Sequence, residues 1–405
     1  MKSPFPQDWK EYTIGDCLRR VEHPVEVDSD ALYTQIGIRS HGKGLFYKEP
    51  VTGELLGSKA VYWVEPNCFI LNIVFAWEQA IGKTTQAEVG MIGSHRFPMY
   101  KPVNNLIDID YLVYYLLTKR GTDILEAASP GGAGRNRTLG QDRFMKSRIV
   151  LPPLDEQQKI AEILATQDKA IELQGRKIEE LKRFKKGCLE KMFPRKGQKV
   201  PEKRFPGFTD DWEQRKLEDY LTVSAEKNTG NIYGRSDVLS VSGDYGIVNQ
   251  IEFQGRSFAG ASVSNYGVVQ TGDVVYTKSP LNSNPYGIIK TNKGKPGIVS
   301  TLYAVYHPKE NAFSDFIQVY FEQHARMNNY MHPLVNKGAK NDMKVSAENA
   351  LKGPVCFPSR IEQKSISAFF SVLDNLITLH QRKLEEMKKQ KKALMQLLLT
   401  GIVRI

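Results

Sequence analysis

Two stretches of this chain are copies of one another: residues 155–193, DEQQKIAEILATQDKAIELQGRKIEELKRFKKGCLEKMF, and residues 361–399, IEQKSISAFFSVLDNLITLHQRKLEEMKKQKKALMQLLL. A shift of 206 positions places Glu156-Gln157 on Glu362-Gln363 and Asp168 on Asp374. Repetition at half the length of a chain indicates two modules of one design. Two such modules suggest a ligand with two related halves.

Both stretches read as long amphipathic helices with heptad character. Apolar side chains recur at the first and fourth positions of successive heptads, and we expect eight of them to pair the helices: Leu164, Ile171, Ile178, Leu181, Phe370, Ile377, Leu384 and Met387. Polar residues interrupt this seam, as they do in coiled coils that fix partner and register. The alternative is that each helix packs only against its own domain.

The length of the helices favours an antiparallel pair. A helix of 39 residues is about 58 Å long, whereas a domain of roughly 150 residues is only about 40 Å across. The second domain joins the end of the first helix to the start of the second, so a parallel pair would require it to bridge the full helix length. We therefore predict an α+β protein with two mixed α/β domains at opposite ends of an antiparallel two-helix coiled coil, related by a pseudo-two-fold axis.

The predicted domain organisation follows the repeat. Short β-branched runs separated by Gly, Asn and Pro indicate many short strands in each globular part. The aromatic-aliphatic segments 111–116 and 316–321 each read as a buried helix. The predicted boundaries are a first domain at 1–154, a first long helix at 155–194, a basic linker at 195–208, a second domain at 209–358 and a second long helix at 359–405.

Composition points toward nucleic acid without requiring it. The chain of 405 residues has a net charge of +11, and residues 182–204 alone carry ten Lys/Arg against two Glu. A basic balance favours nucleic acid or an acidic membrane surface, with a well-solvated linker as the alternative. The four cysteines are isolated from one another and from histidine, so disulfides and a zinc site are not expected. No apolar run is long enough to cross a membrane, and we expect a cytoplasmic protein.

Inverted domains at a fixed separation would match inverted half-sites on double-stranded DNA. Glycine-rich or turn-like segments with basic and amide side chains are the candidate DNA contacts, because Arg and Lys can bind phosphate or guanine and Asn can read adenine. The candidates are Arg39, His41, Lys43, Lys83, Arg135, Asn136, Arg137, Lys278, Asn282, Asn284, Lys337, Lys340 and Asn341. Each could instead belong to an ordinary surface loop. Trp77 and Tyr276 could line the same surface, although such aromatics are more often core.

Complete catalytic motifs are absent from the sequence. The segment 37–44 ends in Gly44 where a phosphate loop needs Ser or Thr, and Asn284-Pro285-Tyr286 is one proline short of an N-P-P-Y loop. We therefore predict a binding subunit with no catalytic residues and no metal site. Two alternatives are a stand-alone DNA methyltransferase or nuclease with degenerate motifs, and a coiled-coil scaffold that ignores DNA.

The whole chain resembles the specificity subunits of type I restriction–modification enzymes. The resemblance rests on the helix starts, Leu151-Pro152-Pro153-Leu154-Asp155-Glu156-Gln157 and Phe357-Pro358 with Ile361-Glu362-Gln363, and on the helix segments 176–182 and 382–388. The second start reads Pro358-Ser359-Arg360 where the family pattern has a double proline.

The resemblance implies two target-recognition domains, each reading one half of a split DNA sequence. It also implies that the paired helices dock two methyltransferase subunits, which use S-adenosylmethionine to methylate adenine. Restriction/translocase subunits would join them and use ATP and Mg²⁺. The resemblance implies no cofactor and no active site on this chain itself.

Overall fold

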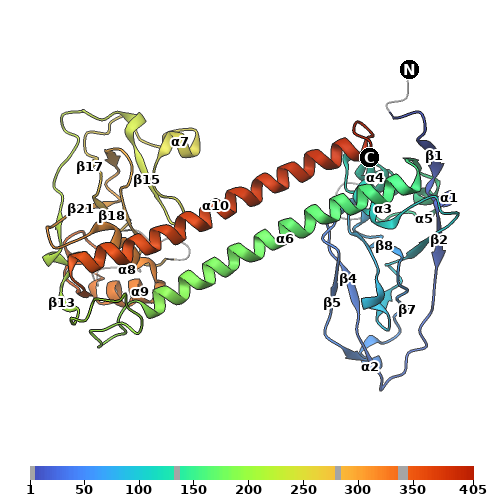
Figure 1. Ribbon diagram of the computed structural model, residues 1–405, viewed down its shortest axis with the longest axis horizontal. Helices are drawn as coiled ribbons and strands as arrows, with labels where there is room; N and C mark the ends of the chain where they lie inside the picture. Colours follow the sequence, from blue (N-terminus) through green and yellow to red (C-terminus); the bar gives the residue numbers. More distant parts are fainter. Residues whose placement is uncertain (1–4, 132–136, 279–283, 336–344) are drawn as a thin grey trace. The chain divides into compact units, whose positions relative to one another are not determined.

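The protein is described by a computed structural model that covers residues 5–131, 137–278, 284–335 and 345–405. It divides into two compact units (Figure 1). Unit 1 comprises Met1–Gly175 with Arg382–Ile405, and unit 2 comprises Arg176–Gln381. Each unit therefore contains one β-rich domain and a segment of each of the two long helices.

The two long helices predicted from the repeat are present. Helix α6 spans Leu154–Lys191 and α10 spans Arg360–Leu399. Both are shorter at the C-terminal end than the sequence analysis expected. Residues 192–194 leave α6 because Pro194 disfavours helical backbone before it, and the side chains of Met192 and Phe193 are buried in the unit 2 core. Helix α10 stops before Gly401, whose φ of +72° is the left-handed conformation typical of a residue that ends a helix.

The unit 1 domain is built on a four-stranded antiparallel sheet with the order β2-β11-β8-β9. Its strands are β2 Leu18–Val21, β11 Met99–Pro102, β8 Phe69–Leu71 and β9 Ile81–Lys83. Around it lie four two-stranded pairs: β1 Lys10–Thr13 with β12 Arg148–Leu151, β3 Leu32–Tyr33 with β6 Val51–Thr52, β4 Ile36–Ile38 with β5 Leu45–Tyr47, and β7 Val61–Trp63 with β10 Ile92–Ser94. The helices are α1 Ile14–Cys17, α2 Gly53–Leu56, α3 Ile109–Leu116, α4 Lys119–Ala128 and α5 Gln141–Lys146, with short 3-10 turns η1 Ala76–Glu78 and η2 Gln86–Glu88.

The unit 2 domain repeats this plan. Its four-stranded sheet has the order β14-β21-β18-β19, formed by Leu221–Val223, Ala304–Pro308, Val274–Tyr276 and Ile289–Thr291. Three further pairs are β13 Glu213–Lys216 with β22 Pro354–Phe357, β15 Leu239–Ser242 with β16 Gly246–Asn249, and β17 Gly267–Val269 with β20 Gly297–Val299. The helices are α7 Gln250–Gln254, α8 Ser314–Glu322 and α9 His324–Met331, with 3-10 turns η3 Leu217–Asp219, η4 Arg235–Asp237, η5 His332–Leu334 and η6 Asn349–Leu351.

Tyr100 and Tyr306, which are 206 positions apart like the repeated helices, occupy matching places in the two domains. Tyr100 lies opposite Phe69 in the first sheet, and Tyr306 lies opposite Val274 in the second. The two segments predicted as buried helices are α3 and α8, which confirms that prediction. The internal repeat therefore extends from the helices to the framework of both domains.

Each domain completes its core with segments of both long helices. In unit 1, Leu164 of α6 and Leu398 of α10 belong to the core that contains α3. In unit 2, Leu189 of α6 and Phe370 of α10 belong to the core that contains α8. The helix segments are thus held together by the domain as well as by their own contacts.

Ion pairs show that the helix segments run antiparallel within each unit. In unit 1, Lys391 of α10 pairs with Asp168 of α6 at 2.5 Å, and Arg404, beyond the end of α10, pairs with Glu156 near the start of α6. In unit 2, Lys185 of α6 pairs with Asp374 of α10 at 2.6 Å, and the ring of Phe193, just beyond the end of α6, lies 6.0 Å from that of Phe370, nearer the start of α10. The repeat maps one lysine–aspartate pair onto the other with the two helices exchanged.

The eight side chains predicted to pair the helices all face away from open solvent. Leu164, Ile178, Phe370 and Ile377 are buried, and Ile171, Leu181, Leu384 and Met387 are half-buried. Their assignment to one helix–helix seam stays a prediction, because Leu164 and Phe370 also belong to the cores of their domains.

Candidate nucleic-acid interface

The most clearly built candidate in unit 1 is the loop that joins β4 to β5, residues 39–44. The Arg39 amide donates to the Gly44 carbonyl at 3.0 Å and closes the loop. His41, Gly42 and Gly44 have φ values of 61°, 63° and 71°, so the chain turns through left-handed conformations. This tight geometry projects the side chains of Arg39, His41 and Lys43 toward solvent, where all three are exposed.

The 3-10 turn η1 holds this loop in place. The His41 amide donates to the Glu78 carbonyl at 2.7 Å, and the Gly42 amide donates to the Gln79 carbonyl at 2.9 Å. The Ser40 hydroxyl donates to the Glu78 carboxylate at 3.0 Å. Three hydrogen bonds to two adjacent residues fix the loop, so its basic side chains start from a preorganised backbone.

Arg39 is oriented by its neighbours in the hairpin. Its guanidinium lies 5.0 Å from the centre of the Phe46 ring and donates to the Leu45 carbonyl at 2.9 Å. Within the described residues, no carboxylate forms an ion pair with Arg39 or Lys43. Both charges remain available to an external anion.

Arg137 meets the same η1 turn from another part of the chain. Its guanidinium lies 5.4 Å from the centre of the Trp77 ring, and the Trp77 indole donates to the Val74 carbonyl at 3.1 Å. The structure therefore brings the 39–44 loop and Arg137 to one turn, although about 100 residues separate them in the chain. Arg135 and Asn136, the other candidates of this segment, lie outside the described residues.

Lys83 has a different environment from the other unit 1 candidates. Its ammonium pairs with the Asp110 carboxylate at 2.6 Å and so links β9 to α3. The lysine side chain is 28% exposed, which leaves it reachable but already paired. A phosphate at this place would have to compete with Asp110.

Fewer of the unit 2 candidates can be placed. Lys278 has a φ of 35° and donates to the Thr301 carbonyl at 2.8 Å. Burial, and then the charge of Lys227, lower the pKa of Lys278, so an anion at this point would relieve the repulsion between the two lysines. Asn284 lies in a turn, and its backbone carbonyl accepts from the Gly287 amide at 2.9 Å. The remaining candidates, Asn282, Lys337, Lys340 and Asn341, lie outside the described residues.

The two aromatic candidates behave differently. Tyr276 is fully buried in the unit 2 core and its hydroxyl donates to the Tyr286 carbonyl at 2.8 Å, so the suggestion that it lines a base-contacting surface is wrong. Trp77 is half-buried and supports Arg137. Sequence reasoning missed Glu78 and Gln79, because they hold the 39–44 loop largely through backbone carbonyls, which any residue type provides.

Comparisons with known proteins agree with this architecture. A family model described as the type I restriction modification DNA specificity domain matches residues 6–183. The type I restriction enzyme MjaVIII specificity subunit of Methanocaldococcus jannaschii is 24% identical over 427 aligned positions, which cover 99% of this chain and 94% of that protein. The chain is thus similar over residues 6–183 to that specificity domain, and along almost its whole length to that specificity subunit.

Two solved structures share the fold of this chain. The S subunit of a type I restriction–modification system from M. genitalium matches with a TM-score of 0.55 and 12% identity, over 98% of this chain and 99% of that one. A chain from a structure on complex assembly and conformational transition of the type I R-M system matches with a TM-score of 0.56 and 14% identity, over 98% and 99% of the two chains.

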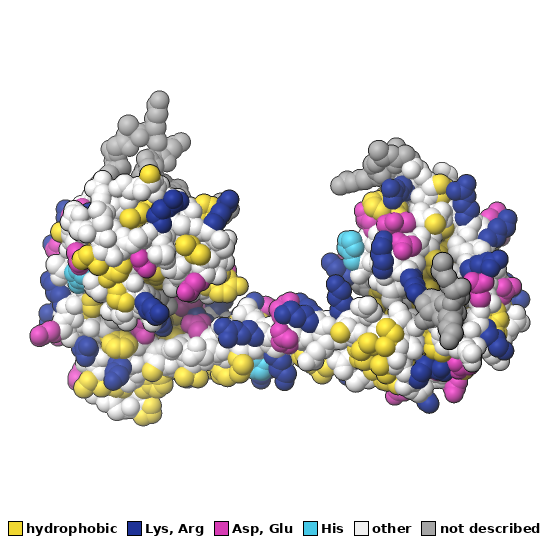
Figure 2. Space-filling model, turned by 90° about the horizontal axis from the view of Figure 1, so that it is seen from above, with side chains coloured by type: hydrophobic (Ala, Val, Ile, Leu, Met, Phe, Trp, Pro, Cys, Tyr) yellow, Lys and Arg dark blue, Asp and Glu magenta, His cyan; other side chains and the backbone are white. Residues whose placement is uncertain are grey.

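The basic run of this chain is partly neutralised by its own carboxylates. Half of the ten Lys/Arg between residues 182 and 204 form ion pairs: Lys182, Lys185, Lys191, Arg195 and Arg204. Figure 2 likewise shows Lys and Arg side chains interspersed with Asp and Glu on the visible face of each domain. The run that favoured nucleic acid in the sequence therefore serves in part to build unit 2, and a basic patch does not by itself locate the DNA site.

The described residues of the chain contain no group of three or more His, Cys, Asp and Glu that could hold a metal ion. The four cysteines are free thiols, and burial raises the pKa of Cys17 and Cys68 to about 11. None of the helices in the described ranges is apolar and long enough to cross a membrane.

Proposed function

We propose that this chain is a specificity subunit of a type I restriction–modification system and that it recognises an asymmetric bipartite DNA target, with one globular domain for each half-site. The observation that carries the proposal is the duplicated framework with unlike loops. Both domains have the same sheet order and the same contacts to α6 and α10, whereas the loop between β4 and β5 and the turn between β15 and β16 differ in length and charge. A shared framework supports equivalent placement on two half-sites, and different loops support different base sequences.

In this proposal the globular parts 1–154 and 209–358 read the half-sites, and α6 and α10 carry the partner subunits. Two methyltransferase subunits dock on the paired helices, and restriction/translocase subunits join that assembly. Those partners use S-adenosylmethionine, ATP and Mg²⁺, while this chain supplies recognition only and acts in the cytoplasm. The absence of complete catalytic motifs in the sequence supports this division of labour.

The direct test is to sequence native DNA for N6-methyladenine in cells with and without the gene. The proposal expects a set of methylated sites that disappears without the gene and that fits a split motif with two unlike halves. A single continuous motif, or no change in methylation, would contradict it. Incubation of the purified chain alone with DNA, S-adenosylmethionine, ATP and Mg²⁺ should give no product. Activity without partners would instead support a stand-alone enzyme.

Arg137 tests the unit 1 candidate site. Replacing Arg137 with alanine should weaken binding of the assembled complex to its own target by more than about 1 kcal/mol, because a bidentate contact to guanine contributes that much. The measurement is fluorescence anisotropy with the methylated motif as a short duplex. The matched control is Arg143→Ala, which removes an exposed arginine of α5 in the same domain. Equal affinities for both variants would remove Arg137 from the site.

The long helices give a prediction about half-site spacing. Both helices continue without interruption through the junctions of the two units, at Gly175 in α6 and Gln381 in α10. Four extra residues at each junction add about 6 Å of helix and keep the pairing within each unit. We expect the accepted spacing between half-sites to change, or assembly to fail, while the bases read stay the same. Changed bases in the methylated motif would show that the helices take part in base recognition.

A further inference from the structure

The two hairpins β4–β5 and β15–β16 occupy equivalent places in their domains. Among the residues that the structure describes, each domain has one isolated antiparallel bridge and one isolated parallel bridge, which flank the hairpin in the same way. In unit 1 these are Pro24 with Tyr62 and Gln35 with Ile92, and in unit 2 they are Lys227 with Gly267 and Val238 with Ile298. The strands that receive the bridges also correspond, since β7 pairs with β10 and β17 pairs with β20, both antiparallel. The turn 243–245 is therefore the structural counterpart of the 39–44 loop.

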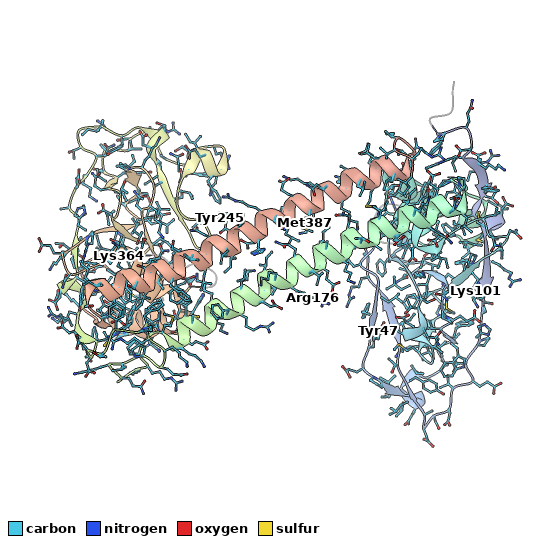
Figure 3. The ribbon with its side chains drawn as sticks, in the orientation of Figure 1. Tyr47, Lys101, Arg176, Tyr245, Lys364 and Met387 are labelled. Carbon is cyan, nitrogen blue, oxygen red and sulfur yellow. The ribbon has the colours of Figure 1, made fainter. Side chains whose placement is uncertain are left out.

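The chemistry of the two turns is nevertheless different. The 39–44 loop carries three basic side chains, whereas Gly243-Asp244-Tyr245 contains no Lys or Arg. Tyr245 is 68% exposed, and its amide donates to the Ser242 hydroxyl at 3.2 Å. Figure 3 labels Tyr245 in unit 2.

Tyr245 belongs to an exposed aromatic patch. Its ring lies 5.0 Å from the ring of Phe253, centre to centre, and Phe253 is 44% exposed. Two further exposed apolar side chains belong to the same region of the chain: Ile251 of α7, which is 40% exposed, and Phe258, which is 57% exposed and whose amide donates to the Gln250 side chain at the start of α7 at 2.8 Å. The guanidinium of Arg256 lies 4.6 Å from the centre of the Phe258 ring. Exposed apolar side chains that are clustered and ordered indicate an interaction surface.

Two features favour DNA over a protein as the occupant. Exposed arginines lie near α7, because Arg256 stacks on Phe258 and Arg235 lies in η4, which packs against α7. Within the described residues neither arginine has a carboxylate partner. The patch also stands where unit 1 presents its basic loop. Aromatic rings and arginine together are the side chains that stack on bases or enter base steps.

We propose that Tyr245, supported by Phe253, contacts the bases of the second half-site by stacking on a base or inserting at a base step. This inference rests on the proposed function. Chemistry on adenine requires the base to leave the stack, and an apolar ring can occupy or stabilise the distorted step. The Asp244 carboxylate in the same turn disfavours a phosphate at this point, so the contact serves base choice and does not add to phosphate binding.

The corresponding hairpin of unit 1 also carries an exposed tyrosine, Tyr47, but its hydroxyl has a partner within the domain. Its hydroxyl donates to the Glu88 carboxylate, which together with burial raises the pKa of the tyrosine. Glu88 thus holds Tyr47 against its own domain. In the described residues the Tyr245 hydroxyl has no such partner, so its ring is free to turn toward a ligand.

The experiment uses the full chain assembled with its methyltransferase partners and the split motif found by sequencing. Tyr245→Ala should weaken binding to a duplex that carries the motif by about tenfold, as loss of one base–aromatic contact does. It should also relax one or more bases in one half-site only. Tyr245→Phe should bind like the original chain, because the ring alone stacks. The control is Ile232→Ala, which removes an 84% exposed apolar side chain of the same domain outside the patch.

The possible outcomes separate the two proposals. If the original complex shows a split motif and Tyr245→Ala leaves both affinity and motif unchanged, the aromatic contact is wrong. The same holds if Tyr245→Phe loses as much affinity as Tyr245→Ala. If Tyr245→Ala instead fails to co-purify with the methyltransferase subunits, with its unfolding transition intact, the patch is a protein interface and the inference is overturned. If the original complex shows no split motif, the proposed function itself fails.

Discussion

Replacement of Gln157 or Gln363 by leucine is expected to lower the free energy of unfolding of its unit by about 3 to 5 kcal/mol. Both glutamines are fully buried near the start of a long helix. The Gln157 amide group donates to the carbonyls of Leu106 and Pro152, both at 2.9 Å, and its carbonyl accepts from the Asp108 amide at 2.9 Å. Leucine has a similar volume, so the main consequence of Gln157→Leu is that three backbone groups lose the hydrogen bond that Gln157 makes to them: the carbonyls of Leu106 and Pro152 and the amide of Asp108.

The expected effect is large because the glutamine positions another helix. Asp108 is the N-cap of α3, and its carboxylate accepts from the Tyr111 amide at 2.9 Å. The same arrangement recurs in unit 2, where Gln363 accepts from the amide of Phe313, the N-cap of α8. Each glutamine therefore connects the start of a long helix to the start of a buried helix of its domain.

Urea unfolding and hydrogen exchange measure this prediction together. Gln157→Leu should increase exchange in α3 while α8 is unaffected, and Gln363→Leu should do the reverse, because each acts within its own unit. Gln158→Leu is the matched control for Gln157→Leu, since the side chain of Gln158 is exposed and lies outside the core. A loss below about 1 kcal/mol, the typical contribution of a single hydrogen bond, would show that water satisfies the stranded groups.

The second large effect is expected for Arg204→Met. The Arg204 guanidinium binds the Glu362 carboxylate through two hydrogen bonds of 2.7 Å, and these bonds raise the pKa of the arginine. The side chains of Arg204 and Glu362 are only 13% and 1% exposed. Removing the cation leaves a buried carboxylate without its partner, which costs about 3 to 5 kcal/mol.

Arg404 gives the internal comparison. It binds Glu156 and Asp8 in unit 1, but its side chain is 41% exposed, so solvent screens part of the loss. Arg404→Met should therefore destabilise unit 1 by less than Arg204→Met destabilises unit 2. Denaturant titration measures both.

Two controls show whether the buried charge causes the loss at Arg204. The double variant Arg204→Met with Glu362→Gln should recover part of the stability, because the stranded group is then neutral. Arg195→Met, which breaks an exposed pair with Glu202, should change the free energy of unfolding by less than about 1 kcal/mol. If the double variant is less stable than Arg204→Met alone, Glu362 has other partners and the explanation is wrong.

Much of the framework could be predicted from the sequence because it depends on local patterns. The heptad spacing predicts α6 and α10, and the apolar runs predict α3 and α8. The repeat predicts that both halves share one plan, and the repeated Glu-Gln marks the helix starts. The predicted ends of the helices were less accurate, since the side chains of Met192 and Phe193 pack into the unit 2 core and these residues do not extend α6. That choice depends on a long-range contact.

The candidate site was predicted less completely than the fold. Basic residues in a glycine-rich loop indicated Arg39, Lys43 and Arg137, and the structure places the loop and Arg137 against one 3-10 turn. No pattern indicated Tyr245, because its turn differs in length and residue type from the 39–44 loop. Only strand pairing shows that the two are counterparts.

The sequence by itself determined two copies of a long helix, two domains of one plan and the absence of complete catalytic motifs, because periodicity and repetition are properties of the chain. The tertiary structure alone decided which charges meet. Arg404 pairs with Glu156 at the start of α6, and Arg204 pairs with Glu362 at the start of α10, although the two arginines are not separated by the 206 positions of the repeat. Lys185 is neutralised by Glu322 and Asp374. Such pairs form between residues that are distant in sequence, so charge counts along the chain cannot reveal them.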